Sequence, residues 1–166
     1  MWFKIISYLK FLLKSTNEHG VHSPFVFNFV TKCLYSKKKL HSNKSIDVLL
    51  KSIGYFNCEN IQINTFPEIE TLVGNTFENI SFDVTLLDML YTDSMSASDF
   101  LELLTKEKLH NDSMILINGI HQDRQKKQAW ESLVALPNIT VSIDMFHCGA
   151  LFVRREQVKE HFTIRI

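Results

Sequence analysis

The stretch Ser113-Met114-Ile115-Leu116-Ile117-Asn118 predicts a buried strand, because its apolar residues follow one another directly and end in a polar amide. The stretch Asp83-Val84-Thr85-Leu86-Leu87-Asp88 has the same character and ends in a carboxylate. Residues 95–107 between them predict a helix, so the two strands are expected to be parallel and joined by a helical crossover. Open α/β sheets bind their ligands at the carboxyl ends of such strands. No glycine-rich loop precedes either strand.

The alternation of helix and strand extends in both directions along the chain. The last two predicted strands are too close together for a helical crossover, so they are expected to form an antiparallel hairpin. The fold class is therefore α/β, with a mainly parallel sheet of about five strands and a pair of helices before it. The remaining elements are predicted at 46–56, 67–73 and 122–135 for helices and at 60–64, 138–144 and 147–153 for strands.

Length and composition bound the kind of protein. The chain has 166 residues, which suits a single domain with a helical pair at 1–35, a linker at 36–44 and an α/β core at 45–166. Lysine plus arginine and aspartate plus glutamate number 18 each, so no overall charge attracts nucleic acid. The 3 cysteines are odd in number and never spaced as C-x-x-C, which argues against disulfides and zinc and favours a reducing cytoplasm.

Residues 2–14 predict an amphipathic helix. Lys4, Ser7, Lys10 and Lys14 fall on one narrow stripe opposite a wide apolar face. The helix is too short and too charged to span a membrane. Its apolar face is expected to pack on its own domain or on a dimer mate, and the basic stripe would also suit a membrane surface.

A second helix is expected to run from Ser23-Pro24 to about Tyr35. The serine can cap the helix, and the proline suits its first position. The linker that follows contains Lys37-Lys38-Lys39, which is expected to be solvated, or secondarily to contact an anion or a membrane.

Several strings of residues resemble one family of enzymes. They are His19-Gly20-Val21-His22-Ser23-Pro24-Phe25-Val26-Phe27, Asn111-Asp112-Ser113, Ile120-His121, Gln128-Ala129-Trp130 and the ending Lys159-Glu160-His161-Phe162-Thr163-Ile164-Arg165-Ile166. In these strings the chain resembles the class I S-adenosylmethionine-dependent methyltransferases of Bacteroidetes-type bacteria, and the resemblance extends over roughly residues 1–35 and 57–166. The resemblance implies a Rossmann-like, methyltransferase-type sheet and S-adenosylmethionine as the family's cofactor.

The chain departs from that family where the cofactor would bind. The family's Glu-Leu-Gly-Thr-like loop and the acidic residue on its next strand are absent, and no two of the 5 glycines lie close enough for a backbone cradle. The family's Asp-Gly-Asn-His-like run reads Asp88-Met89-Leu90-Tyr91 here, and its Asp-Asp-Ile-His-like run reads Asn118-Gly119-Ile120-His121. The chain is interpreted as a shortened and degenerate member that lacks the glycine-rich cofactor loop.

Strand 60–64 can be aligned with the family in two ways. The favoured alignment makes it the family's third strand, and the other makes it the first cofactor strand, followed by Thr65-Phe66-Pro67-Glu68. Proline offers no N–H to a ligand and phenylalanine blocks close approach, so either alignment loses the standard cofactor loop. The expected strand order is 60–64, 83–88, 113–118, 147–153 and 138–144. Strand 60–64 is then an exposed edge, expected to be covered by the N-terminal helices or by a second copy in a homodimer.

Three polar residues form the candidate site. Asp88, Asn118 and His121 are expected near one another at the carboxyl ends of adjacent strands. Asp88 and His121 are the candidate catalytic residues, with His121 as a general base. No metal is predicted, although the three residues together are a weak candidate for holding a hard divalent cation. The alternative is that Asp88 and Asn118 cap the following helices and His121 makes a surface or backbone hydrogen bond.

Other conspicuous residues have structural interpretations. His19 and His22 flank a glycine and are expected to hold the turn between the first two helices, or to form a second polar cluster. Trp130 is expected in the core. Cys148-Gly149 is expected in the terminal hairpin, where the glycine permits close backbone contact.

Three function hypotheses follow. The first is a degenerate methyltransferase-like protein without cofactor binding or catalysis, acting as a binding, regulatory or assembly module. The second is a minimal S-adenosylmethionine-dependent methyltransferase on an unknown acceptor, with Asp88 or His121 near the reaction centre and a cofactor loop borrowed from another subunit. The third is a protein attached to a membrane surface through helix 2–14 and Lys37-Lys38-Lys39.

Overall fold

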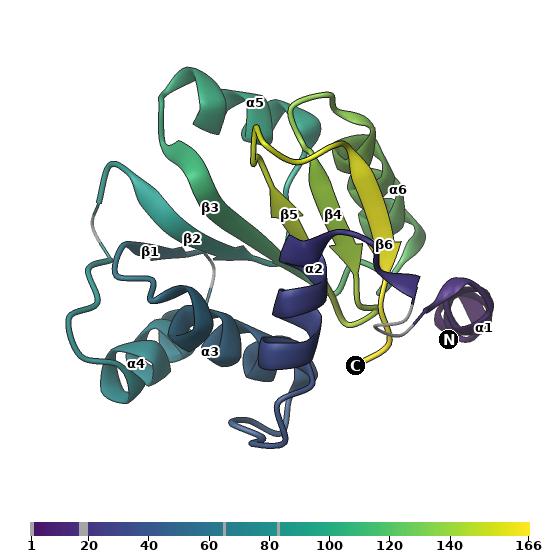
Figure 1. The fold of residues 1–166 in the computed structure, drawn as a ribbon, viewed down its shortest axis with the longest axis horizontal. Helices are drawn as coiled ribbons and strands as arrows, with labels where there is room; N and C mark the ends of the chain where they lie inside the picture. The colour runs from purple at the N-terminus through teal and green to yellow at the C-terminus, as the bar shows by residue number, and fades with distance from the viewer. Residues whose placement is uncertain (1, 17–19, 65, 83) are drawn as a thin grey trace.

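The structure, a computed structural model, describes residues 2–16, 20–64, 66–82 and 84–166. A six-stranded sheet runs in the order β1-β2-β3-β5-β4-β6, and helices cover both of its faces (Figure 1). The strands are β1 Ile61–Ile63, β2 Leu87–Thr92, β3 Leu109–Asn118, β4 Val141–Asp144, β5 Cys148–Phe152 and β6 Glu160–Thr163. The helices are α1 Trp2–Lys14, α2 Pro24–Asn28, the π-helix η2 Phe29–Leu34, α3 Lys44–Phe56, α4 Pro67–Thr76, α5 Ala97–Thr105 and α6 Arg124–Ala135.

All the described strands of the sheet run in the same direction except β5. β1, β2 and β3 pair in parallel, β5 pairs antiparallel with both β3 and β4, and β6 pairs in parallel with β4. Among the described strands, β5 is therefore the one that runs against the others. The predicted α/β class, the predicted order of the first five strands and the antiparallel hairpin of β4 and β5 are all confirmed.

The sheet is buried on both faces. α2, η2, α3 and α4 pack on one face, and α5 and α6 pack on the other (Figure 1). Neighbouring residues of the central strands point to opposite layers: Met89 and Leu116 belong to the core that includes α3, whereas Leu90 and Ile115 belong to the core with Trp130 of α6. All four strand residues are 2 % exposed or less. Double burial explains why these strands read as unbroken apolar runs in the sequence.

The strand predicted at 83–88 is displaced: it begins at Leu87 and ends at Thr92. Leu86 is 47 % exposed, whereas Leu87 and Leu90 are 1 % exposed or less. An apolar run buried on both faces has no alternation to mark its ends, so the pattern alone placed the strand too early. The consequence is that Asp88 lies near the start of β2 and not at its end. Asp83 is outside the described residues.

β6 extends the sheet beyond β4 and is absent from the sequence prediction. Only Phe162 and Ile164 are buried in this segment, which gives too short an alternation to predict a strand. The N–H of Thr16 donates to the carbonyl oxygen of Thr163 at 2.8 Å, so the chain after α1 runs along the β6 edge. Figure 1 shows α1 end-on beside β6.

At the opposite edge of the sheet, the segment at Ser81 is hydrogen-bonded beside the start of β1, whereas the sequence analysis expected the N-terminal helices or a second copy there. The N–H of Ile61 donates to the carbonyl oxygen of Ser81 at 2.9 Å, and the N–H of Ser81 donates to Glu59 at 2.8 Å. The expectation that the N-terminal helices cover this edge is wrong. α1 lies at the far edge, and the second helix packs over β5, where Phe25 contacts Phe152 with ring centroids 5.1 Å apart.

The start of the second helix follows the sequence prediction. Ser23 is the N-cap, its Oγ accepts the N–H of Val26 at 3.4 Å, and Pro24 is the first helical residue. The helix then widens into η2 and ends at Leu34, one residue before the predicted end at Tyr35.

Candidate functional site

The structure separates Asp88 from the other two candidate site residues. Asp88 lies at the amino end of β2, whereas Asn118 ends β3 and His121 follows it. One carboxylate oxygen of Asp88 accepts the N–H groups of Glu59 and Asn60 at 2.9 and 2.8 Å. The expectation that the three residues lie near one another is therefore wrong, because the strand that carries Asp88 begins later than the sequence pattern indicates.

Asp88 has a structural role that explains its place in an apolar strand. Its second oxygen contacts Nε2 of His110 at 2.9 Å, so the carboxylate links the starts of β1, β2 and β3. Burial opposes the charge of Asp88, but the N–H groups of Asn60 and Glu59 and the contact with His110 outweigh it. They hold the pKa of the carboxyl below its usual value.

The Asp88→Asn variant is expected to be less stable than the parent chain at neutral pH and to lose that disadvantage in acid. The folded-state pKa of Asp88 is lowered, so the stabilisation by its charge is complete above the unfolded value of about 3.9 and disappears as the pH falls through the folded value. Urea unfolding at a series of pH values measures this. The difference between the two chains should be constant above about pH 5 and shrink below about pH 4. A difference that stays constant down to pH 2 would contradict it.

Asn118 and His121 do come together, at the carboxyl edge of the sheet. Both line a cavity of about 220 Å³, together with Lys4 of α1 and His147, the residue before β5. Gly119 between them has φ +69°, and its N–H donates to the carbonyl oxygen of His147 at 2.8 Å. Asn118 does not cap the helix that follows, since the N-cap of α6 is Asp123. The capping alternative is therefore also wrong for this residue, and Ser96, not Asp88, caps α5.

His121 is held on both ring nitrogens. Its Nε2 contacts Oδ2 of Asp144, the last residue of β4, at 2.7 Å, and its Nδ1 is hydrogen-bonded to Oγ of Ser7 in α1. Nζ of Lys127 lies 3.3 Å from the same Asp144 oxygen. The His121 ring also stacks on Phe146, with centroids 4.9 Å apart. These contacts join α1, the loop after β3, β4 and α6 at one point.

Asp144 is charged at this point in spite of its burial. Burial opposes ionisation, but the hydrogen bond and charge of His121, the charge of Lys127 and the N–H of Phe146 outweigh it and lower the pKa of the carboxyl. The ionised Asp144 accepts a hydrogen bond from Nε2–H of His121.

A serine, a histidine and an aspartate in series are also the groups of an acyl-transfer triad. Here Ser7 is in the middle of a helix and only 8 % exposed. The direct effect of this hydrogen-bond chain is to fasten α1 to the carboxyl edge. Ser7 and Asp144 were beyond the sequence prediction because they lie 114 and 23 residues from His121. The only available signal was that Ser7 interrupts the apolar residues of α1.

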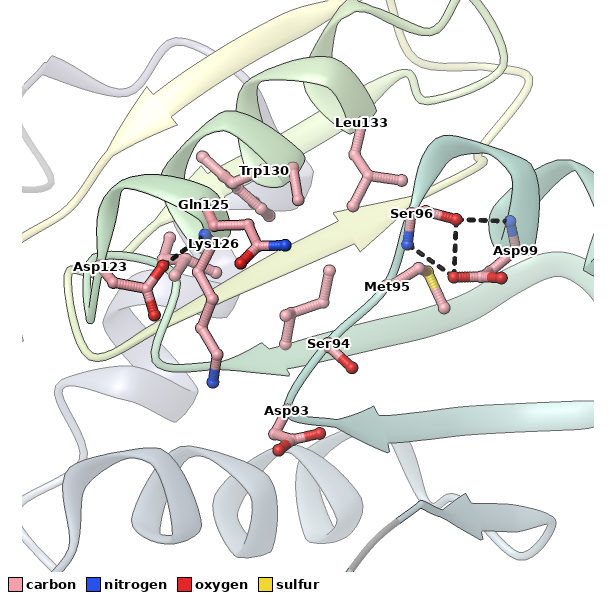
Figure 2. A pocket seen from close by; sticks show the side chains of 13 residues that line it. Asp93, Ser94, Met95, Ser96, Asp99, Asp123, Gln125, Lys126, Trp130 and Leu133 are labelled. Atoms are coloured by element: carbon pink, nitrogen blue, oxygen red, sulfur yellow. Dashed lines mark hydrogen bonds between the residues drawn. The ribbon is translucent and has the colours of Figure 1, made fainter.

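The pocket between α5 and α6 contains none of the three predicted site residues (Figure 2). It has a volume of about 370 Å³, and its apolar lining includes Ile117, Ile120 and Trp130. Ser96 and Asp99 face each other at one side in a capping box, whose Ser-x-x-Asp spacing is visible in the sequence. The polar groups of Ser96 and Asp99 are therefore engaged in hydrogen bonds at the start of α5.

On the other side of the same pocket, the polar side chains are hydrogen-bonded at the start of α6. Asp123 accepts the N–H of Lys126 at 2.8 Å, and Nζ of Lys126 donates to Gln122 at 3.0 Å. Figure 2 shows the Lys126 side chain and Asp93 at the same mouth of the pocket. The contacts of Asp123 and Lys126 are therefore those of a helix start.

The segment after β1 is where the sequence comparison placed a cofactor loop under one alignment. Phe66 precedes α4, and its ring lies 5.7 Å from the ring of Tyr91 in β2. The carbonyl oxygen of Phe66 accepts the N–H groups of Ile69 and Glu70. Pro67 is the first residue of α4 and has no N–H to offer. Thr65 lies outside the described residues.

Tyr91 is fixed beneath this segment. It is 1 % exposed, and its hydroxyl lies 3.1 Å from Oγ of Ser45 in α3. Burial raises the pKa of the phenol to about 12. The Phe66 and Tyr91 rings therefore occupy the end of β1 on the α3 side.

No group of three His, Cys, Asp or Glu side chains suited to a metal ion occurs among the described residues. Cys33, Cys58 and Cys148 are free and buried, and burial raises the pKa of each thiol to about 12. His22 is exposed, and its expected partner His19 lies outside the described residues.

The comparisons with known proteins identify no family for the chain. No protein-family model matches the chain, and no curated protein matches it significantly in sequence. A solved structure described as a "putative caffeoyl-CoA O-methyltransferase from Staphylococcus aureus" is similar with a TM-score of 0.49 and 11% identity, over 91% of this chain and 98% of that chain. That likeness is too weak to assign any residue. The strand order with its single reversed strand defines a methyltransferase-like Rossmann fold in the described residues.

Proposed function

We propose that this chain is a methyltransferase-like domain that does not bind S-adenosylmethionine and acts as a binding, regulatory or assembly module. The observation that carries the proposal is the packing of Phe66 on Tyr91 at the end of β1, followed directly by Pro67. A cofactor held at this position needs a loop that approaches it closely and offers backbone N–H groups. The Phe66 ring prevents a close approach and Pro67 has no N–H to donate, so these residues do not fit S-adenosylmethionine.

The contacts of the candidate catalytic residues also support loss of catalysis. Asp88 holds the N–H groups of Glu59 and Asn60 at the amino end of the sheet, away from the edge where α/β enzymes bind ligands. His121 is engaged by Ser7 and Asp144. Neither side chain is arranged to act on a methyl acceptor, which weighs against the alternative of a minimal active methyltransferase.

Calorimetric titration of the full chain with S-adenosylmethionine and S-adenosylhomocysteine tests the proposal. We expect no binding heat, and no rise in Tm at 1 mM of either compound. A ligand at 100 times its Kd would raise the free energy of unfolding by about 2.7 kcal/mol, which is about 5–10 °C in Tm for a domain of this size. Binding at micromolar strength would overturn the proposal. The Asp88→Asn variant serves as a control, since a genuine site at the carboxyl edge should not respond to it.

A further inference from the structure

Helix α1 is docked with its apolar face turned outward. Ser7 and Phe11 are its only buried residues. Trp2 is 78 % exposed, Leu9 56 % and Leu13 88 %. Of the ten large apolar side chains that are exposed in the described residues, six lie on this helix: Trp2, Ile5, Ile6, Tyr8, Leu9 and Leu13. Exposed apolar surface of this extent on one element marks an interaction site.

The contacts that seat α1 prevent it from turning over. Ser7 is hydrogen-bonded to His121, and Phe11 packs on Phe146 with ring centroids 5.4 Å apart. Tyr8 meets the edge of the same Phe146 ring at 4.8 Å. Ser7 and Phe11 define the inward face and Tyr8 lies at its border, so rotating the helix to bury Leu9 and its neighbours would break all three contacts. The sequence analysis expected the apolar face to pack on its own domain or on a dimer mate. In the structure, the helix packs on its own domain through Ser7 and Phe11, and the apolar face stays uncovered.

The charges around that face indicate what covers it. Lys4 and Lys10 fall at its two borders at the helical spacing of 100° per residue, and residues 2–14 contain no acidic side chain. All the lysines of α1, Lys14 included, are exposed. Two copies of α1 packed face to face would bring these lysines together without an acidic partner from the helix. A surface of anionic phosphates would instead neutralise them.

The groove beside α1 adds charge of the same sign. Between α1 and α6 lies a groove of about 1030 Å³ lined by Lys10, Lys14, Arg124 and Lys127. Lys127 is paired with Asp144 and lies 3.9 Å from Glu131, so the exposed Arg124 is the positive charge that this groove adds to Lys10 and Lys14 of α1. Trp2 and Tyr8 are also residue types that favour the boundary between water and lipid.

We propose that α1 is a membrane-surface anchor that lies in the headgroup region of a bilayer containing anionic phospholipid. The apolar face enters the acyl boundary, Lys4 and Lys10 reach the phosphates at its borders, and Ser7 and Phe11 hold the α/β domain on the aqueous side. No described helix is long and apolar enough to cross a bilayer. The anchor does not depend on whether S-adenosylmethionine binds, so either proposal can fail without the other.

Co-sedimentation of the full chain with vesicles tests the anchor. We expect binding to phosphatidylcholine vesicles that contain phosphatidylserine at low salt, weaker binding in 0.5 M salt, and little binding to phosphatidylcholine alone. The Leu9→Glu/Leu13→Glu variant should lose at least tenfold in binding. Val158→Glu is the control, because Val158 is 85 % exposed but lies in the loop before β6 and not on α1, and it should bind like the parent chain.

A second readout keeps the test independent of any folding defect. Lipids brominated near the headgroup should quench the emission of Trp2 in the parent chain, and the Trp2→Phe variant should show no such quenching because Trp130 is buried. Three results would overturn the proposal. They are no sedimentation at low salt, sedimentation that survives Leu9→Glu/Leu13→Glu, and a vesicle-free dimer that the same variant converts to a monomer, which would assign the face to a second copy.

Discussion

Replacing Asp144 by alanine is expected to lower the free energy of unfolding by about 3–5 kcal/mol, the usual cost of removing one partner from a buried ion pair. Asp144 is 4 % exposed and accepts hydrogen bonds from Nε2 of His121 at 2.7 Å and from the N–H of Phe146 at 2.9 Å. Lys127 lies 3.3 Å away. Alanine would leave an ammonium group and a backbone N–H without their acceptor, and it would also loosen the seat of α1.

Guanidinium unfolding followed by the emission of Trp130 measures this loss. Trp2 is exposed and would add a second signal, so the comparison is made in a Trp2→Phe background. Asp144→Asn is the control, because the amide oxygen still accepts a hydrogen bond from Phe146 or His121, and it should cost less than the alanine variant. A loss below about 1 kcal/mol for Asp144→Ala would contradict the role assigned to this carboxylate.

Gly149→Ala is expected to lower the free energy of unfolding by about 2–3 kcal/mol through overpacking. A Cβ at this position of β5 would lie 2.5 Å from Cζ3 and 2.6 Å from Cη2 of Trp130. The indole is 2 % exposed and rigid, so it cannot move aside without disturbing the contact of α6 with the sheet. The sequence predicted close backbone contact at Gly149, whereas the structure places the side chain of Trp130 against it.

A glycine elsewhere in the fold supplies the control. A Cβ on Gly74 of α4 would meet the Phe82 ring at 3.5 Å, which is ordinary contact. Gly74→Ala should therefore lose nothing and gain up to about 1 kcal/mol from helix propensity. Trp130→Phe combined with Gly149→Ala should recover part of the loss, because the smaller ring leaves room. Equal stability of the Gly149→Ala and Gly74→Ala variants would contradict the steric argument.

The sequence predicted more of the fold than of the site. Strand order followed from the alternation of elements and the short hairpin, and five of the six strands in the sheet were placed in the right sequence. The error at β2 was a shift along the chain, since an unbroken apolar run does not mark where it begins. Because of that shift, Asp88 lies at the opposite end of the strands from Asn118 and His121. The three residues therefore do not form the site that the sequence predicted.

What the sequence alone determined is local: the alternation that makes an α/β sheet, the Ser23-Pro24 helix start, and the apolar and basic faces of residues 2–14. Periodicity reports which residues share a face, because side-chain direction repeats with the backbone. Only the tertiary structure decided which way that helix faces and what His121 binds. Both depend on the contact between Ser7 and His121, residues 114 apart, and a local pattern carries no information about a partner at that distance.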